Sequence, residues 1–177
     1  MDSALLKEHV RDVPDHPKPG IIFKDITPLL ADPEALAGAV DALAECVTPL
    51  RPDIVLGAES RGFILGPALA IRLGVGFAIA RKPGKLPWTT VTASYALEYG
   101  QDSLELHDDA IREGMRVLVH DDLLATGGTA RATCDLAEAV GGTVVGCAFL
   151  IELAFLGGRE RLAPFPVHAL ISYDSEG

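Results

Sequence analysis

Apolar residues recur at two different spacings along this chain, and the spacing separates helices from strands. From residue 33 onward, apolar positions follow one another at intervals of four, three and four, which places them on one face of a helix. These positions are Leu36, Val40, Leu43 and Val47. Asp32 and Pro33 suit a helix N-terminus, since Asp caps well and Pro fits the first turn. We therefore predict a helix that starts at residue 33 and ends before Pro49.

Short, continuous apolar runs predict buried strands instead. Five such runs occur, at residues 53–57, 76–80, 115–120, 143–151 and 167–172, with further helical segments at 63–73 and 128–140. Buried strands that alternate with helices are typical of a parallel sheet covered on both faces. With 177 residues, the chain is long enough for one such core and short for two. We predict a single-domain α/β fold over residues 1–177, with a twisted, mainly parallel central sheet and helices on both faces.

Residues 81–109 interrupt this alternation. The segment starts with the polar, Pro- and Gly-rich stretch RKPGKLPWTT and continues with VTASYALEYG, in which apolar and polar residues alternate weakly. Long loops in compact domains are usually functional or disordered. We expect a mobile lid, built as a loose hairpin between the second and third strands.

The composition limits the kinds of partner. The formal net charge is −10, which argues against a nucleic-acid or anionic-membrane surface because both require clustered cations. A small anionic ligand stays compatible with a few locally concentrated cations. Cys46, Cys134 and Cys147 are far apart, and we expect free thiols in a reducing cytoplasm. The first residues lack the apolar segment of a signal peptide, so we expect a soluble, cytoplasmic protein.

The stretch VLVHDDLLATGGTAR at residues 117–131 carries the clearest chemistry. Asp121 and Asp122 repel each other at the end of an apolar strand, a conflict expected where function overrides propensity. Ligands of open α/β sheets bind at such carboxyl ends. The segment from Thr126 to Thr129 leads into a helix N-terminus, where free N–H groups and the helix dipole favour a phosphate. Carboxylates that accept hydrogen bonds from a diol, close to a phosphate, indicate a ribose 5-phosphate site; a solvated turn is the alternative.

Cationic side chains follow the first two strands. They are Arg61, preceded by Ser60, after one strand, and Arg81, Lys82 and Lys85 after the other. If the strand order brings these loops together, they form a cationic site that suits a pyrophosphate group with Mg²⁺. Two plainer interpretations stay open: the arginine after the first strand pairs with Glu59 or another acid, and the two lysines are ordinary loop surface.

Together these motifs resemble the type I phosphoribosyltransferases. The resemblance rests on six stretches: PGIIFKDITPLL (19–30), GAESRGFILGPALA (57–70), RKPGKLP (81–87), ASYALEYG (93–100), HDDLLATGGTA (120–130) and GGRERLAP (157–164). They occur in the family's order and run nearly end to end. The resemblance implies transfer of a phosphoribosyl group from phosphoribosyl pyrophosphate to a base, with Mg²⁺, in a homodimer.

The resemblance also implies roles for single residues at the donor site. The 5-phosphate is held by Ala125, Thr126, Gly127, Gly128 and Thr129, the ribose diol by Asp121 and Asp122, and the pyrophosphate by Ser60, Arg61, Arg81, Lys82 and Lys85. Among the cations, Arg81 is expected to reach the site of the neighbouring subunit. The metal is expected to bind mostly through oxygens of the donor and water, so no protein ligand is assigned. The residues implied in catalysis are Arg61, Glu98, Asp121 and Asp122.

Two further segments are implied to form the base site. An N-terminal hood over residues 1–32 holds a purine through Ile22, Phe23 and Lys24, and the lid contributes Glu98 near the base and Tyr99 as a cover. Lysine stands at position 24 where many relatives have arginine, and it lacks the planar fork of that side chain. The stretches IIFKDI and ASYALEYG favour adenine as the base and therefore AMP as the product. Whether the lid acid protonates, deprotonates or only orients the base is left open.

Position 120 departs from the family pattern. His120 stands where relatives usually have an aliphatic residue. We expect a partly buried strand histidine, with proton transfer as the alternative.

Two other functions stay open at this point. A transferase of the same fold that acts on hypoxanthine, guanine, xanthine or orotate would share the donor site. A regulator that senses phosphoribosyl pyrophosphate and binds DNA would need an added basic module, which does not fit a net charge of −10.

Overall fold

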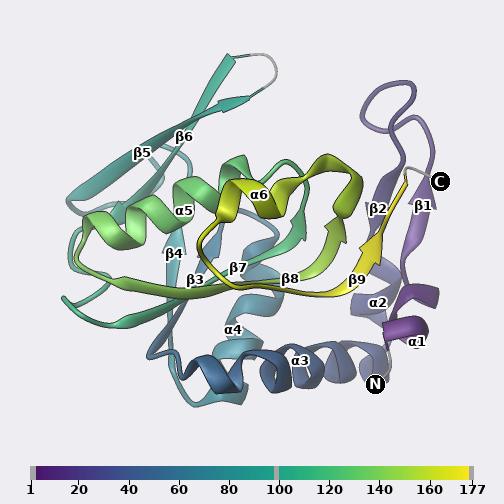
Figure 1. Cartoon of the computed structure of the whole chain (residues 1–177), viewed down its shortest axis with the longest axis horizontal. Coiled ribbons are helices and arrows are strands. Elements are labelled where there is room, and N and C mark those ends of the chain that lie inside the picture. The colour runs from purple at the N-terminus through teal and green to yellow at the C-terminus, as the bar shows by residue number, and fades with distance from the viewer. Residues whose placement is uncertain (1–2, 98–99, 176–177) are drawn as a thin grey trace.

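A five-stranded parallel sheet, in the order β4-β3-β7-β8-β9, forms the centre of the molecule (Figure 1). The computed structural model describes residues 3–97 and 100–175. The strands are β3 (Ile54–Ala58), β4 (Gly76–Ala80), β7 (Arg116–Leu124), β8 (Thr143–Leu153) and β9 (Val167–Tyr173). Every neighbouring pair runs parallel, which confirms the predicted sheet. No helix within the described ranges is long and apolar enough to cross a membrane.

Helices cover both faces of the sheet, each over its own apolar core. On one face, α3 (Pro33–Val47) and α4 (Gly62–Leu73) pack against residues such as Val55 and Leu118. On the other, α5 (Gly128–Ala139) packs against Leu56 and Val119. The predicted start of α3 is confirmed, because the Asp32 carboxylate accepts hydrogen bonds from the N–H groups of residues 34 and 35 at 2.9 and 2.8 Å. Shorter turns complete the chain: η1 (Thr48–Leu50), η2 (Ala154–Leu156) and α6 (Gly158–Leu162).

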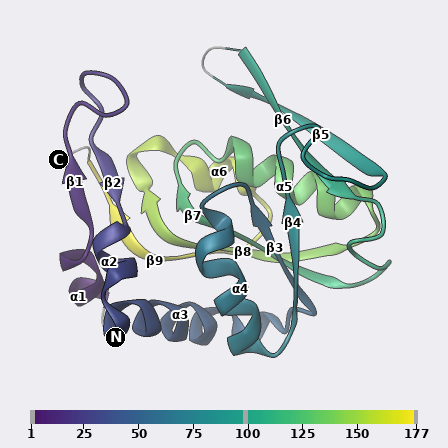
Figure 2. The same ribbon diagram turned by 180° about the vertical axis from the view of Figure 1, so that it is seen from behind.

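The hood lies at one end of the sheet (Figures 1 and 2). It contains α1 (Ser3–Glu8), an antiparallel pair of short strands, β1 (Arg11–Val13) and β2 (Phe23–Asp25), and α2 (Thr27–Ala31). The last strand of the sheet, β9, ends beside it. The hood is therefore joined to the sheet by residues near both ends of the chain.

The lid segment forms the predicted hairpin from β5 (Thr90–Leu97) and β6 (Gly100–His107). It is more regular than a loose hairpin: Leu104 and Leu106 are fully buried in the core under α5. The backbones of Arg81 and Glu105 also exchange two hydrogen bonds of 2.9 and 2.7 Å, which tie the hairpin to the end of β4. Its mobility stays a prediction.

One strand boundary was predicted too early. The strand expected to end at residue 120 continues to Leu124, because β8 is long enough to pair with it as far as the Leu124–Glu152 step. On its other side, β7 pairs with β3 only as far as the step between Gly57 and His120. Asp121 and Asp122 therefore lie within a strand, on an extension that has a neighbour on one side only.

Candidate functional site

The loops after β3, β4 and β7 meet at the carboxyl ends of these strands, since the three strands are neighbours in the sheet. They enclose a cavity of about 310 Å³ below the hairpin. Its lining consists of Glu59, Ser60, Arg61, Lys82, Tyr95, Asp102 and the residues 121–130. We expected a cationic site only if the strand order brought these loops together. It does: the acid pair, the glycine-rich loop and the loops that carry the cations lie side by side.

The glycine-rich loop at residues 125–129 supplies backbone donors at the start of α5. Gly127 is the N-cap, with φ of +80°, and a Cβ there would lie 2.7 Å from the carbonyl oxygen of Gly158. Only glycine fits both the conformation and the space. Because a glycine N-cap offers no side-chain acceptor, the first N–H groups of the helix stay available for an anion. All five residues predicted to hold a phosphate line the cavity: Ala125, Thr126, Gly127, Gly128 and Thr129.

The two carboxylates sit in a desolvated place. Asp122 is 2% exposed, and its backbone N–H donates to Asp121 Oδ1 at 2.8 Å. Burial, and then the charge of its neighbour, raises the pKa of Asp121 well above its ordinary value. Burial also raises the pKa of Asp122, although Arg61 opposes this. The ionised pair therefore needs hydroxyl or cationic partners, and a solvated turn is excluded.

Asp122 has an acceptor to spare. Its Oδ2 is buried and makes no hydrogen bond of good geometry within the described part of the chain. The nearest cation is Arg61, with 3.2 Å between its Nε and this oxygen. The same guanidinium lies 5.0 Å from the ring centroid of Phe23 in the hood. Arg61 thus contacts Asp122 and the hood at once; it pairs with another acid rather than with Glu59, as one of the open interpretations allowed.

The cations after β4 are held by acids that the sequence analysis did not assign to the site. Arg81 Nη2 lies 3.1 Å from Glu59 Oε1, and this contact lowers the pKa of the carboxyl. The backbone N–H of Lys82 donates to the same carboxylate at 2.7 Å, while its ammonium pairs with Asp102. Of these cations, Lys82 lines the cavity; Arg81 and Lys85 stand just outside its lining.

Tyr95 and Asp102 connect the hairpin to the glycine-rich loop. The Tyr95 hydroxyl donates to Asp102 Oδ2 at 3.1 Å and accepts a hydrogen bond from Thr129 Oγ1 at 3.4 Å. Tyr95 belongs to the weakly alternating stretch ASYALEYG, so the alternation could have predicted that its side chain faces inward. Asp102 was not, because its place depends on the register of the hairpin.

The cavity is acidic overall. Among the described lining residues, four side chains are acidic (Glu59, Asp102, Asp121 and Asp122) and two are basic (Arg61 and Lys82). An anionic ligand therefore binds more tightly when further cations are present, either bound to the ligand or supplied from outside the cavity. Within residues 3–97 and 100–175 there is no group of three or more His, Cys, Asp or Glu side chains arranged to hold a metal ion.

The predicted base-site residues lie apart from the donor cavity. Phe23 approaches it through Arg61, whereas Ile22 and Lys24 are absent from its lining. The Lys24 ammonium points elsewhere: it lies 2.7 Å from Asp12 Oδ1, and the residue is 3% exposed. The predicted lid residues at positions 98 and 99 fall outside the described residues.

His120 is a strand histidine, as expected, and it is fully rather than partly buried. Its Nδ1 donates to the carbonyl oxygen of Ala148 at 3.0 Å, and burial lowers its pKa to about 4. The ring is therefore neutral at neutral pH, and it is absent from the cavity lining. Proton transfer from this side chain receives no support.

Known proteins resemble this chain in both sequence and fold. The model of the phosphoribosyl transferase domain family matches residues 26–163. An adenine phosphoribosyltransferase of Rubrobacter xylanophilus is 58% identical over 170 residues, covering 96% of this chain and 92% of the relative. The crystal structure of adenine phosphoribosyltransferase from Thermoanaerobacter pseudethanolicus superposes with a TM-score of 0.95 at 48% identity, covering 97% of this chain and 99% of the other. The enzyme of that name from Saccharomyces cerevisiae, complexed with adenine and an imino-altritol bisphosphate, gives 0.90 at 39% identity, with 95% and 97% covered.

Proposed function

The chain belongs to the phosphoribosyltransferase family, and we propose that it transfers the 5-phosphoribosyl group of phosphoribosyl pyrophosphate to adenine, forming AMP and pyrophosphate. The observation that carries this proposal is the cavity itself, in which a phosphate loop, a buried acid pair and strand-end cations converge. Relatives named for adenine cover nearly the whole chain, which supports the choice of base.

The donor fits the cavity in three parts. The 5-phosphate binds the N–H groups and hydroxyls of residues 125–129 at the start of α5. The ribose diol donates to Asp121 and Asp122, which supplies the partner that the buried Asp122 Oδ2 lacks. The pyrophosphate faces Ser60, Arg61 and Lys82, with Arg81 and Lys85 at the margin.

The reaction breaks the bond between the anomeric carbon and pyrophosphate, whose oxygen keeps the electron pair. A purine nitrogen forms the new bond to that carbon and loses its proton. Catalysis therefore comes mainly from stabilising the departing negative charge, through Arg61 and the other cations, and from holding the base in line. Asp121 and Asp122 also favour the positive charge that develops on the ribose. When bound with the donor, Mg²⁺ neutralises part of the diphosphate charge.

The hood and the lid hold the base in this proposal. Ile22, Phe23 and Lys24 offer apolar contact and backbone hydrogen bonds, and the lid closes to exclude water, which otherwise competes as a nucleophile. Glu98 lies near the base after closure, and Tyr99 covers the site.

We expect Glu98→Ala to lower kcat by about 100-fold, since acid–base assistance contributes roughly that much, while the Kd of the donor changes less than about threefold. Steady-state kinetics and donor titration measure the two effects. A variant that weakened donor binding alone would contradict a role for this acid beside the base.

A homodimer completes the site. Arg81 follows the edge strand β4 directly, so an interface that carries it to a second subunit must cover this edge. Three isoleucines there and on the adjacent α4 support such an interface by their exposure: Ile64 (44%), Ile71 (81%) and Ile79 (37%). Reaching across requires the pair between Arg81 and its own Glu59 to open.

A cytoplasmic location is also proposed. Cys134 and Cys147 lie with their sulfur atoms 3.6 Å apart inside the core, and both are free thiols. This supports a reducing compartment.

The test is to incubate the purified protein with phosphoribosyl pyrophosphate, Mg²⁺ and each of adenine, hypoxanthine, guanine and orotate in turn. Nucleotide and pyrophosphate are measured in each case. We expect AMP from adenine and little product from the other bases. Preference for another base would overturn the assignment of the hood, and donor binding without any product would favour the regulator.

A further inference from the structure

The strand β2 presents two chemically different faces. Successive side chains of a strand point to opposite sides, so Phe23 and Asp25 share one face and Lys24 takes the other. Phe23 lies against the Arg61 guanidinium at 5.0 Å, on the side of the donor cavity. Lys24 points away from that cavity and towards the end of the sheet. The position of Phe23 over the site thus depends on what holds the other face.

Lys24 is held between an acid and an aromatic ring. Its ammonium lies 2.7 Å from Asp12 Oδ1, and Asp12 is its direct neighbour across the β1–β2 pair. The same nitrogen lies 4.0 Å from the ring centroid of Tyr173, the last residue of β9. Lys7 of α1 approaches this ring as well, at 4.3 Å. Two hood lysines therefore meet one ring at the end of the sheet.

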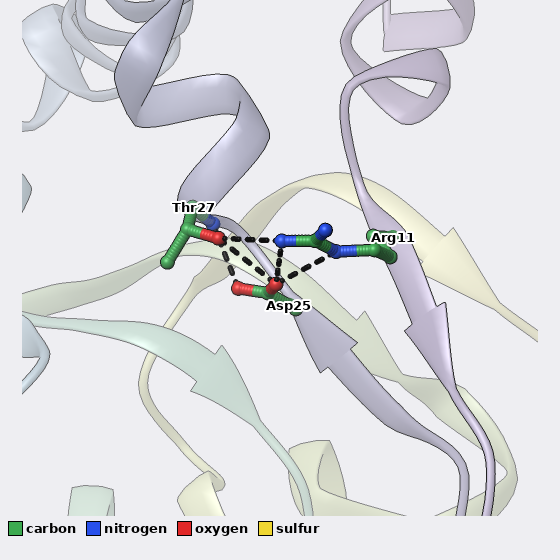
Figure 3. Close-up of polar contacts among 3 residues, drawn as sticks. All are labelled: Arg11, Asp25 and Thr27. Carbon is green, nitrogen blue, oxygen red and sulfur yellow. Dashed lines mark hydrogen bonds and ion pairs between the residues drawn. The ribbon is translucent and has the colours of Figure 1, made fainter.

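A second ion pair in the same two strands provides a comparison. Arg11 donates to Asp25 Oδ2 through Nε at 3.0 Å and Nη2 at 2.7 Å, and Nη2 also reaches Thr27 Oγ1 (Figure 3). The Arg11 side chain is 60% exposed, whereas that of Lys24 is 2% exposed. Exposed pairs contribute little, but a buried ammonium that loses its partners is strongly unfavourable. The two pairs are alike in chemistry and differ in the burial of the cation, whereas the acids differ in the opposite sense: the side chain of Asp12 is 51% exposed and that of Asp25 17%.

We propose that Lys24 is a positioning residue: held between Asp12 and the ring of Tyr173, it fixes the hood on β9 and so sets the place of Phe23 beside the donor site. The inference rests on the proposed function, in which the hood holds the base. It assigns to the lysine side chain a role at the joint of the hood rather than a contact with the base. Loss of the Lys24 side chain should weaken the binding of the base and leave the binding of the donor unchanged.

The experiment replaces each partner and measures the kinetics of both substrates. Lys24→Met should raise the KM for adenine about tenfold, the equivalent of losing a desolvated cation–π contact, with kcat and the donor KM within about twofold. Tyr173→Leu should act in the same way, while Tyr173→Phe, which keeps the ring, should stay near the wild type. Lys24→Arg should rescue the adenine KM, because arginine also pairs with carboxylates and stacks on rings.

Arg11→Met is the matched control in the same two strands. It removes the exposed pair, and we expect the adenine KM to change less than about twofold. Amide hydrogen exchange of residues 11–13 and 23–25 supplies a readout independent of turnover: it should rise in Lys24→Met and not in Arg11→Met, with the central sheet unchanged in both.

Three results would overturn the inference: an unchanged adenine KM in Lys24→Met, an equal rise in Arg11→Met, or a parallel rise in the donor KM. A variant that does not fold is replaced by Tyr173→Leu, which leaves the charge of the hood intact. A failure of the proposed function would look different, because the wild type itself would then form no AMP from adenine.

Discussion

At the scale of single residues, the acid pair lowers the stability of the fold when it is ionised. Burial raises the pKa of Asp121 and Asp122, so the folded protein resists ionising them more than the unfolded chain does. Between the ordinary Asp value and the raised values, the folded state holds more protons. The free energy of unfolding therefore falls as pH rises through that interval. In the proposed function this cost has a purpose, because ionised carboxylates accept hydrogen bonds from the ribose diol.

We expect the double change Asp121→Asn and Asp122→Asn to lower kcat at least about 100-fold, since it removes preorganised charge at the reacting ribose. The folded protein should be at least as stable as the wild type at pH 8, because no buried charge has to form. Thermal unfolding between pH 4 and pH 8 checks the second point: the part of the pH dependence due to these carboxyls should disappear. Near-normal turnover would contradict the diol assignment.

His120 gives a pH dependence of the opposite sign. Its pKa falls from 6.5 to about 4 on folding, so within that interval the unfolded state binds a proton that the folded state does not. Stability should therefore fall as pH drops from 6.5 to 4, by on the order of 3 kcal/mol. His120→Val should flatten this interval relative to the wild type in urea titrations, with little change in kcat at neutral pH. An unchanged slope would show that the ring is not buried as described.

At the scale of elements, α6 supports the phosphate loop from behind. A Cβ on Gly158 would lie 2.3 Å from the carbonyl oxygen of Ala125, and one on Gly127 would meet the backbone of Gly158 in turn. The carboxylate of Glu152 accepts two hydrogen bonds of 2.7 Å from the Arg159 guanidinium, which holds the start of α6 to the end of β8. The loop is thus positioned by a segment that does not line the cavity.

Gly158→Ala should displace Ala125 and weaken the 5-phosphate site. We expect the donor KM to rise about tenfold, since roughly one backbone hydrogen bond to an anion is lost. Gly76→Ala is the control, because a Cβ there meets only ordinary contacts at 3.8 Å. The two variants are compared by donor titration and thermal unfolding. Equal donor affinity in both would contradict the supporting role of α6.

At the scale of the whole molecule, an acidic protein with an acidic cavity binds an anionic donor. The lining alone does not balance that charge, so the proposed function relies on added cations, namely an ion bound with the donor and the Arg81 of a second subunit. This makes the proposed dimer part of the chemistry.

Mixing two inactive variants tests this arrangement. Arg81→Ala chains keep the acid pair, and the Asp121→Asn, Asp122→Asn chains keep Arg81, so a hybrid dimer has one complete site. A 1:1 mixture should recover about a quarter of the wild-type activity, since half of the dimers are hybrids with one good site each. Native mass spectrometry verifies the hybrids. Verified hybrids without activity would contradict supply across the interface.

The fold and many of the residues that line the cavity were predictable from the sequence, and the reasons are local. The apolar period marked α3, continuous apolar runs marked the five strands, and the glycine-rich loop must sit at a helix start. The end of β7 was not predictable, because it depends on the length of β8 beside it. The actual partners of Glu59 and Asp102 were not predictable for the same reason. Their contacts with Arg81 and Lys82 join segments far apart in the chain.

The joint between hood and sheet has a consequence for synthesis. The chain emerges from the ribosome N-terminus first, so Lys7 and Lys24 appear long before the ring of Tyr173 that they contact. The strands and loops of the donor cavity, up to residue 130, also precede β9. A nascent chain can therefore assemble the segments that line the cavity while the hood rests on α3, before the ring of Tyr173 has been made. The order of translation delays a competent enzyme until its last strand is made.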